Sequence, residues 1–500
     1  MSPQPLDLQA RLEKIRRLFP PDTAIYLVGG AVRDVLLEKT SHDLDFAVAR
    51  NAREAARHVA DSLRVAYYPL DDERDTGRVV APQPDGSRQV MDFALLQGAD
   101  IYSDLSARDY TINAMALDLR HPDQLIDPLG GAADLRNRQL RPCSETALQD
   151  DPVRVLRGIR LASSLNYRLL PETLRLLRLA VPGLQRVSPE RLRDELFRIL
   201  ESPRLGASLE IMDRLGVLAR VLPELPALQG VIQPAPHIYD AWVHTLATAE
   251  KLQAIWAALD VNGVPDSAAN LMMGLLSLRI GRYREQAASH YNQRLNPDRS
   301  LMGLVTLAAL YHDAAKPHTA SQDNSGKTHF YDHDQSGALL ARQRAVELRL
   351  SNDEVEHLET IVRNHMRPLL LGHAGELPSR RSIYRFFRAT GLAGVDVCFL
   401  SLADFLATYG HEASQDSWLH HLDVIRLLLS AWWEQTEEVV FPPPLINGNT
   451  LMEHFALSPG PQVGELLEAV REAQAAGQVR SLDEAVKLVE ALLERGKQAL

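Results

Sequence analysis

The pattern of helix and strand signals changes near Asn137, and this change constrains the fold more than any other feature of the sequence. Before it, short apolar runs at residues 24–28 and 44–48 flank a glycine pair and the start of a helix at 31–37. After it, strand signals almost vanish, and long segments rich in Leu, Arg, Ala and Glu are separated by Pro and Gly. The sequence therefore predicts an α+β protein, with a small mixed-sheet domain followed by helical domains.

Size and composition exclude several classes of protein. The chain has 500 residues, 45% of them hydrophobic, which is enough for several buried cores and excludes a disordered or fibrous protein. The first residues mix charges with leucines, unlike a signal peptide, and the longest apolar run, 301–311, is shorter than the ~20 residues that span a bilayer. The two cysteines, Cys143 and Cys398, are too far apart in sequence to suggest a disulfide scaffold. We therefore expect a soluble, cytoplasmic protein without a membrane partner.

One segment is strongly basic although the whole chain carries a formal charge of −11. Residues 136–204 contain fourteen Arg and no Lys, against eight Asp and Glu. The planar guanidinium group suits contacts with phosphates and bases. The segment therefore favours a nucleic-acid-binding face, and a solvated helix surface with paired charges is the alternative.

Glycines and aspartates follow or occupy the predicted strands. Gly29 and Gly30 come just before a helix, where backbone N–H groups can approach an anion. Asp43 and Asp45 are two residues apart on a strand, so both carboxylates face the same side. Such a pair favours a bound cation, and its hard oxygen ligands suit Mg²⁺ in a site that activates a hydroxyl and neutralises a leaving pyrophosphate. Asp92, in another predicted strand, is a weaker candidate for a third carboxylate.

Several motifs together resemble those of the class II tRNA nucleotidyltransferase and bacterial poly(A) polymerase family. They are Gly29-Gly30-Ala31-Val32-Arg33-Asp34, Asp43-Leu44-Asp45 and Arg108-Asp109-Tyr110-Thr111-Ile112-Asn113-Ala114-Met115-Ala116, followed by segments at 127–131, 150–160 and 188–191. The resemblance implies template-independent addition of C, C and A to the 3′ end of tRNA, with CTP and ATP as the other substrates. A poly(A) polymerase and a partial CC-adding or A-adding enzyme are the alternatives within this family.

The resemblance also implies roles for residues of the first domain. Asp43 and Asp45 would hold the catalytic Mg²⁺, and Gly30 and Arg33 would contact the nucleotide triphosphate. Arg108 matches a position near the nucleotide and its ribose, and an ion pair with Asp109 that caps a helix is the structural alternative.

Asp151 and Arg154 match the pair that serves in the family as an amino-acid template for the incoming base. Cytosine and adenine both present an amino donor beside a ring-nitrogen acceptor, which a carboxylate and a guanidinium can bind together. Uracil and guanine present the opposite pattern and would leave buried polar groups unpaired. On a helix the two residues would lie on one face. Arg157 and Arg160 would continue that face toward the phosphates or the RNA 3′ end.

A second group of residues resembles the metal ligands of an HD-type phosphohydrolase domain. Its members are His244, His312, Asp313 and Asp404, with His333 and His365 as further ligands of a second ion. Imidazole and carboxylate together suit a transition metal such as Mn²⁺, Ni²⁺, Fe or Co²⁺. A metal-bound hydroxide there could hydrolyse a phosphomonoester or a 2′,3′-cyclic phosphate at an RNA end. The alternative is a helical scaffold that supports tRNA without turnover.

We therefore expect four domains in sequence. They are a nucleotidyltransferase head at residues 1–140, a helical neck with base-reading and RNA-binding residues at 141–230, an HD domain at 231–440 and a helical tail at 441–500. By resemblance, the tail would lie along the tRNA. A flexible loop implicated in switching from C to A addition should fall at 67–80, and the sequence there does not match the family pattern. Full CCA, CC-only and A-only addition therefore remain open.

Overall fold

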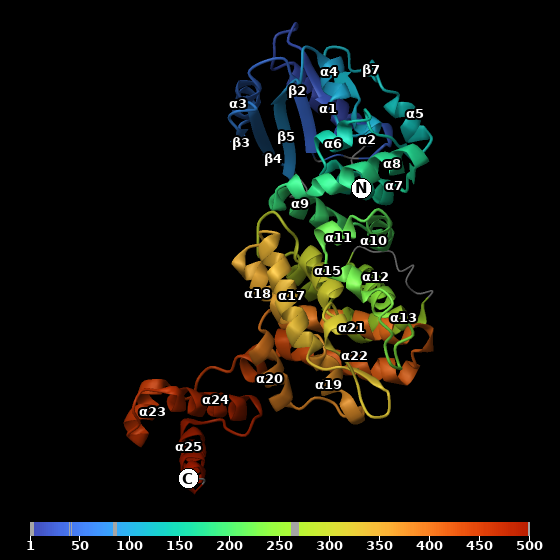
Figure 1. Ribbon diagram of the computed structural model, residues 1–500. Helices are drawn as coiled ribbons and strands as arrows, with labels where there is room; N and C mark the ends of the chain where they lie inside the picture. Colours follow the sequence, from blue (N-terminus) through green and yellow to red (C-terminus); the bar gives the residue numbers. More distant parts are fainter. Residues whose placement is uncertain (1–4, 40, 42, 84–87, 262–269, 499–500) are drawn as a thin grey trace. The chain divides into compact units, whose positions relative to one another are not determined.

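The computed structural model describes residues 5–39, 41, 43–83, 88–261 and 270–498 (Figure 1). The chain forms two compact units, which are described separately below. Unit 1 consists of Met1–Glu195 and Glu210–Arg220, and unit 2 of Leu196–Leu209 and Val221–Leu500. The domain boundaries expected at residues 140, 230 and 440 stay predictions.

Unit 1 contains a mixed sheet with seven described strands in the order β3-β4-β5-β2-β1-β6-β7. The strands are β1 (Ile25–Val28), β2 (Asp43–Val48), β3 (Ala66–Asp71), β4 (Thr76–Pro82), β5 (Arg88–Leu95), β6 (Ala116–Asp118) and β7 (Leu125–Ile126). Only β2 and β5 pair in parallel among them, with Asp45 opposite Asp92, and Val28 of β1 lies opposite Asp45 from the other side. The strands predicted at 24–28 and 44–48 are thus β1 and β2, at the centre of the sheet.

Helices cover the sheet and follow it. The described helices before residue 140 are α1 (Pro5–Arg16), α2 (Gly30–Leu36), α3 (Ala52–Leu63), α4 (Ile101–Ser106) and α5 (Gly131–Arg136). Phe46 and Phe93 stack with their ring centroids 4.8 Å apart, and both are fully buried. This apolar face holds β2 and β5 together, so the polar residues of β2 point away from it.

After residue 137 the chain is helical except for short strand pairs. The next helices are α6 (Ala147–Asp150), α7 (Arg154–Leu165), α8 (Pro171–Ala180), α9 (Pro189–Leu200), α10 (Leu205–Arg214) and α11 (Leu218–Val221). The pairs are β8 (Gln139–Leu140) with β9 (Arg168–Leu169), and β10 (Ala320–Gln322) with β11 (Thr328–Phe330). The near-absence of strand signals predicted helices here correctly and missed these two- and three-residue strands.

Unit 2 is built from long helices around one apolar helix. Its helices up to residue 434 are α12 (Ala241–Leu259), α13 (Leu271–Ile280), α14 (Arg284–Tyr291), α15 (Leu301–Tyr311), α16 (Lys316–Thr319), α17 (His333–Glu347), α18 (Asn352–Asn364), α19 (Arg367–Leu371), α20 (Arg380–Thr390), α21 (Ala393–Tyr409) and α22 (Gln415–Glu434). Helix α21 packs on α12, α18 and α22. Among the described residues, Ala393–Glu412 is long and apolar enough to cross a membrane, but 78% of it is buried inside the fold, as expected of a core helix.

The C-terminal helices of unit 2 have a hydrophobic cluster of their own. They are α23 (Gly448–Phe455), α24 (Pro461–Ala475) and α25 (Leu482–Gln498). The cluster consists of Ile446, Leu451, Val463, Leu466, Val470, Ala473, Val479, Ala485 and Val489. The C-terminal region predicted to be helical, 441–500, contains these three helices.

Candidate active site and metal centre

Asp43 and Asp45 lie on the same face of β2. Both are exposed, while Leu44 and Phe46 between and after them are buried. Neither aspartate forms an ion pair with any residue that the structure describes. Desolvation by the surrounding protein, followed by repulsion from Asp92, raises the pKa of Asp45. Two carboxylates on one strand face, with no ion-pair partner among the described residues, fit the expected Mg²⁺ site.

Gly29 brings the backbone close to this carboxylate pair. Its φ angle is +75°, and a Cβ atom there would lie 3.3 Å from Asp45 Oδ2 and 3.2 Å from Arg108 Nη1. A side chain would therefore be strained by the backbone and would also press on both charged groups. The glycine lets both Arg108 and Asp45 approach the backbone at the end of β1.

Asp92 lies beside Asp45, as the weaker hypothesis of a third carboxylate requires. However, Arg78 of β4 binds it with two parallel hydrogen bonds, from Nε to Oδ1 and from Nη2 to Oδ2, each 2.8 Å long. Such a bidentate pair occupies both carboxylate oxygens. In this arrangement Asp92 acts on Asp45 through its charge.

Arg33 and Arg108 are both held beside the glycine turn. Arg33 donates to Asp34 Oδ1 at 3.0 and 2.8 Å and to Asn113 Oδ1 at 2.8 Å, and its Nη2 would be 3.4 Å from a Cβ atom at Gly30. Arg108 forms an ion pair with buried Asp104 at 2.8 Å. The structure thus brings Arg33, predicted to contact the triphosphate, and Arg108, predicted to lie near the nucleotide and its ribose, to the same turn.

The alternative partner suggested for Arg108 was wrong. Asp109 is buried and accepts hydrogen bonds from the Tyr110 N–H, Asn113 and Arg157. Burial opposes its ionisation, but Arg157 and these donors hold the pKa of Asp109 below its usual value. Asp104 pairs with Arg108 because it lies four residues earlier on α4, one helical turn away.

Asp151 and Arg154 are close together, but they do not share a helix. Asp151 has extended backbone after α6, and α7 begins at Arg154. Pro152 explains the break, because a residue before proline is disfavoured in helical conformation. Arg154 Nε still lies 3.8 Å from Asp151 Oδ2. The guanidinium of Arg154 also donates to the carbonyl oxygens of Ala107, Arg108 and Ala147.

Arg191 is a site residue that reasoning from spacing missed. Its Nη2 donates to Asp151 Oδ2 at 2.7 Å, a shorter contact than that of Arg154. The only signal in the sequence was the motif at 188–191, which reasoning from spacing could not connect to Asp151. Arg191 therefore orients the carboxylate that the resemblance assigns to base recognition.

Arg157 and Arg160 face acidic side chains of the same unit. Arg157 contacts Asp109 at 3.1 Å and Glu195 at 3.2 Å, and Arg160 contacts Glu195 at 3.1 Å. The two arginines do continue the helical face from Arg154, as predicted. Their contacts with nucleotide or RNA stay predictions, and this network gives them a structural role.

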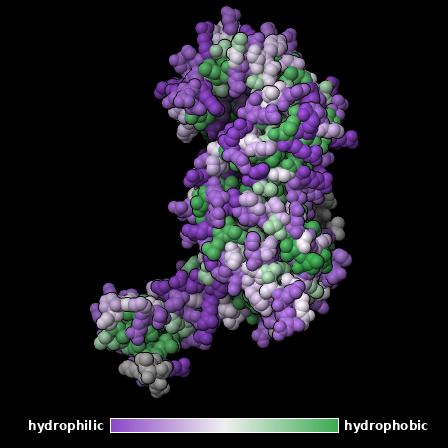
Figure 2. Space-filling view, viewed as in Figure 1, coloured by the Kyte–Doolittle hydropathy of each residue, from purple (hydrophilic) through white to green (hydrophobic). Residues whose placement is uncertain are grey.

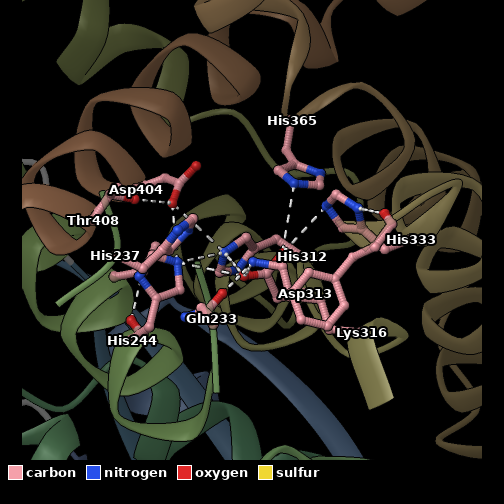
Figure 3. Close-up of polar contacts among 12 residues, drawn as sticks. Gln233, His237, His244, His312, Asp313, Lys316, His333, His365, Asp404 and Thr408 are labelled. Carbon is pink, nitrogen blue, oxygen red and sulfur yellow. Dashed lines mark hydrogen bonds and ion pairs between the residues drawn. The ribbon is translucent and has the colours of Figure 1, made fainter. Parts of the chain in front are cut away.

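The six predicted HD residues come together in unit 2 (Figure 3). His244 lies on α12, His312 and Asp313 at the end of α15, and His333 at the start of α17. His365 lies at the end of α18 and Asp404 on α21. Two groups with metal-ligand spacing share Asp313: one with His244 and His312, the other with His333 and His365. Asp404 Oδ1 lies 3.1 Å from His244 Nε2. Each group could hold a metal ion, and Asp313 belongs to both groups.

Backbone carbonyls set the tautomer of three of these histidines. The Nδ1 atoms of His312, His333 and His365 each lie 2.7 Å from the carbonyl oxygen three residues earlier. Because a carbonyl only accepts, each Nδ1 carries a proton, and the lone pair of the neutral imidazole is then on Nε2. The buried Nε2 atoms of His333 and His365 have no hydrogen-bond partner among the described residues. Buried lone pairs aimed at one carboxylate fit a bound metal ion.

Three further residues join this cluster that the sequence analysis did not select. Lys316 Nζ donates to Asp313 Oδ2 at 2.6 Å and to Gln233 Oε1. The ring of His237 lies 5.1 Å from that of His244, and burial lowers the pKa of His237 to about 4. A cavity of about 380 Å³ opens onto the cluster and is lined by Lys316, Lys327 and apolar side chains such as Phe330 and Phe405. No sequence spacing links residue 233 to residue 316, so only the fold could reveal this contact.

Comparison with known proteins gives the same order of parts. Family models match the Poly A polymerase head domain at residues 25–141, the probable RNA and SrmB-binding site of polymerase A at 166–228, and the HD domain at 242–386. The A-adding tRNA nucleotidyltransferase of Deinococcus radiodurans is 34% identical over 478 residues, which cover 94% of this chain and 96% of that protein. The chain belongs to the class II CCA-adding enzyme and poly(A) polymerase family.

A second relative and a solved structure agree with this family and its fold. The CC-adding tRNA nucleotidyltransferase of Thermus thermophilus is 32% identical over 468 residues, covering 92% of this chain and 91% of that protein. The solved complex of a CCA-adding enzyme with ATP shares the fold, with a TM-score of 0.59 at 21% identity over 98% of this chain and 95% of that one. The family and the α+β fold predicted from the motifs are thus confirmed, and the roles of individual residues stay predictions.

Proposed function

We propose that this nucleotidyltransferase adds nucleotides of the CCA end to the 3′ end of tRNA, with CTP, ATP or both as the nucleotide substrate. The observation that carries the proposal is the carboxylate pair Asp43 and Asp45 on one face of β2, with Asp45 and Arg108 both close to Gly29. When bound there, Mg²⁺ supplies positive charge for an attacking hydroxyl and a leaving pyrophosphate. The full-length relatives compared above are both named as tRNA nucleotidyltransferases.

Different residues of the protein would bind the phosphates and the base of the nucleotide. Arg33 and Arg108 hold fixed positive charge at the glycine turn, where the triphosphate would lie. Asp151, oriented by Arg191, would accept from the amino group of cytosine or adenine, and Arg154 would donate to the ring nitrogen beside it. Three of the five N–H groups of Arg154 donate to backbone carbonyls, and these contacts would hold the guanidinium in place for the base.

We further propose that the enzyme adds C residues and does not complete the CCA end. The segment at 67–80, where the resemblance places a loop that switches from C to A addition, forms a hairpin of β3 and β4 joined by residues 72–75 only. Such a tight connection offers little room for a rearranging loop. The relatives compared above over their full length are partial enzymes, one adding A and one adding CC. Full CCA addition, which the motifs alone led us to expect, is the competing outcome.

The test uses three tRNA transcripts that end at the discriminator base, at C and at CC. Each is incubated with the protein and Mg²⁺, with CTP, with ATP and with both, and the 3′ ends are sequenced. We expect CC on the first transcript, one C on the second and nothing on the third. Addition of A to the third transcript would overturn CC-only addition: together with CC on the first transcript it would show full CCA addition, and alone it would show an A-adding enzyme. Long A tails would identify a poly(A) polymerase. No addition to any transcript would reject nucleotidyl transfer to tRNA.

A second candidate activity is hydrolysis of phosphate esters at the HD cluster. The unpaired Nε2 atoms of His333 and His365 around Asp313 favour it over a scaffold without turnover. A metal ion held by these ligands would supply an activated water molecule as the nucleophile, and the cations Lys316 and Lys327 at the cavity would attract the phosphate. Release of phosphate from 3′-phosphorylated RNA ends, and opening of 2′,3′-cyclic ends to a phosphomonoester, with Mn²⁺, Ni²⁺ or Co²⁺, test this. Metal binding without any turnover would leave the scaffold interpretation.

A further inference from the structure

Helix α20 has an unusual charge distribution within an acidic chain. Its sequence, Arg380–Thr390, contains four arginines and neither lysine nor any acidic residue. Its apolar side chains, among them Tyr384, Phe386 and Phe387, are buried against the rest of unit 2. The arginines therefore share the outer face of the helix; they are Arg380, Arg381, Arg385 and Arg388. We call these four residues the α20 arginine row.

Helix α24 holds the inner edges of these guanidinium groups. Arg385 donates to both oxygens of Glu472 at 2.7 and 2.9 Å, and Arg388 Nε donates to Glu468 at 3.1 Å. Arg381 contacts Glu472 at 3.1 Å and Gln478 at 2.8 Å. Arg380 donates to the carbonyl oxygen of Ala475 and lies 3.4 Å from Glu438. Two glutamates of one helix thus set the orientation of three arginines.

The outer edges of the row face solvent. The side chains of Arg385 and Arg388 are 61% and 62% exposed, whereas Glu472 is only 20% exposed. Within the described part of the chain, Arg385 Nη1 and both Nη groups of Arg388 have no hydrogen-bond partner. Figure 2 shows a continuous hydrophilic surface where α20 and α24 meet. Fixed guanidinium groups with open donors lose little side-chain entropy on binding an anion.

We propose that the α20 arginine row binds the phosphate backbone of RNA. Glu468 and Glu472 act as an inner layer that orients the guanidinium groups, and the outward N–H groups donate to successive phosphates. The row is separate from the basic segment at 136–204 and from both candidate active sites. The identification of the RNA as tRNA rests on the proposed function, whereas the binding of an RNA backbone does not.

The experiment measures binding of tRNA to the full chain by fluorescence anisotropy, without nucleotides, at several salt concentrations. We expect the double variant R385A/R388A to bind about three- to tenfold more weakly at low salt. The slope of log K against log salt should become shallower by about 2, because two phosphates would no longer be neutralised by an arginine. An unchanged dissociation constant and an unchanged slope would overturn the proposal.

The variant E468Q/E472Q is the matched control. It breaks the same ion pairs from the other side and removes two negative charges, but it keeps the arginines. We expect it to bind tRNA as tightly as the parent protein or more tightly. If it weakens binding as much as R385A/R388A, the arginines act only by holding α24, and the proposal is wrong. Thermal melting of both variants verifies that each is folded.

Activity assays on the same proteins distinguish a failure of RNA binding by α20 from a failure of the proposed function. In the three-transcript assay, R385A/R388A should raise the KM for tRNA and leave kcat unchanged, because the row is not at the reacting atoms. If the parent protein adds no nucleotide but binds tRNA with the expected salt dependence on the row, nucleotidyl transfer fails and RNA binding by α20 stands.

Discussion

Gly29 lies between the Asp45 carboxylate and the Arg108 guanidinium, so its missing side chain matters twice. We predict that Gly29→Ala lowers stability by about 1–3 kcal/mol, because φ +75° with ψ −140° is a conformation that residues with a side chain rarely adopt. It should also reduce nucleotide incorporation by at least about tenfold by displacing both charged groups. Gly216 is the control, because it also has a φ of +75° and has nothing within 4 Å of a Cβ atom. Gly216→Ala should lower stability with unchanged incorporation. Melting and incorporation assays on both variants check this, and equal activities would contradict the crowding argument.

Asp45 is a proposed Mg²⁺ ligand, and its ionised carboxylate lowers the stability of the fold. Its pKa is raised in the folded chain by desolvation and by Asp92, so the ionised carboxylate is disfavoured by folding and stability is lost as pH rises through this pKa. We predict that Asp45→Asn abolishes nucleotide incorporation while raising the melting temperature at pH 7 in EDTA by about 1–2 °C. The difference should shrink when the pH is lowered to about 4, where the parent carboxyl becomes protonated. A variant that melts lower than the parent at pH 7 would contradict the prediction.

At the scale of elements, α18 and α21 each carry two polar groups with the same spacing. His357 and His365 are eight residues apart on α18 and its C-terminal end, and Asp396 and Asp404 are eight residues apart on α21. Asp396 accepts hydrogen bonds from His357 at 2.6 Å and from His290 of α14 at 2.9 Å, fully buried. Burial opposes ionisation, but His290 and His357 lower the pKa of Asp396 to about 2. This cluster holds the two helices together. Eight residues separate it from the metal ligands His365 and Asp404, which is about 12 Å along each helix axis.

We predict that Asp396→Asn lowers stability by about 3 kcal/mol, because it disrupts a buried charged cluster. It should also weaken binding of Mn²⁺ or Co²⁺ at the distant HD cluster, since His365 and Asp404 lose their common support. Isothermal titration calorimetry with the metal measures the affinity, and chemical denaturation measures the stability. Cys398→Ala removes a buried thiol from the same helix. It is the control for a general loss of packing around α21. If both variants lose metal affinity equally, the cluster has no specific positioning role.

At the scale of the whole molecule, the two sets of candidate ligands lie in different compact units. The carboxylate pair belongs to unit 1 and the HD cluster to unit 2. We predict that His333→Ala halves the number of Mn²⁺ ions bound at the HD cluster and changes nucleotide incorporation by less than about twofold. Asp43→Ala should do the reverse, with no incorporation and unchanged Mn²⁺ binding at the HD cluster. Metal analysis and the transcript assay check both variants. If one variant loses both Mn²⁺ binding and nucleotide incorporation, the two sites are coupled.

Much of the fold and of the candidate sites could be predicted from the sequence, because the relevant patterns are local. Alternation along a strand places Asp43 and Asp45 on one face whatever the rest of the chain does. The apolar runs and breakers around Gly29 specify β1 and α2 for the same reason. The family motifs add the HD ligands, although they are spread over more than a hundred residues.

The tertiary structure alone decided which side chains meet across long separations in sequence. Pro152 breaks the helix that spacing predicted, yet the fold still brings Asp151 to Arg154 and adds Arg191. Arg108 pairs with Asp104 and not with its neighbour Asp109, whose carboxylate is turned toward Arg157. The contact of Lys316 with Gln233 and the docking of α24 on the α20 arginine row have no periodic signal. Periodicity determines which way a side chain points on its own element, whereas its partner depends on how whole elements pack.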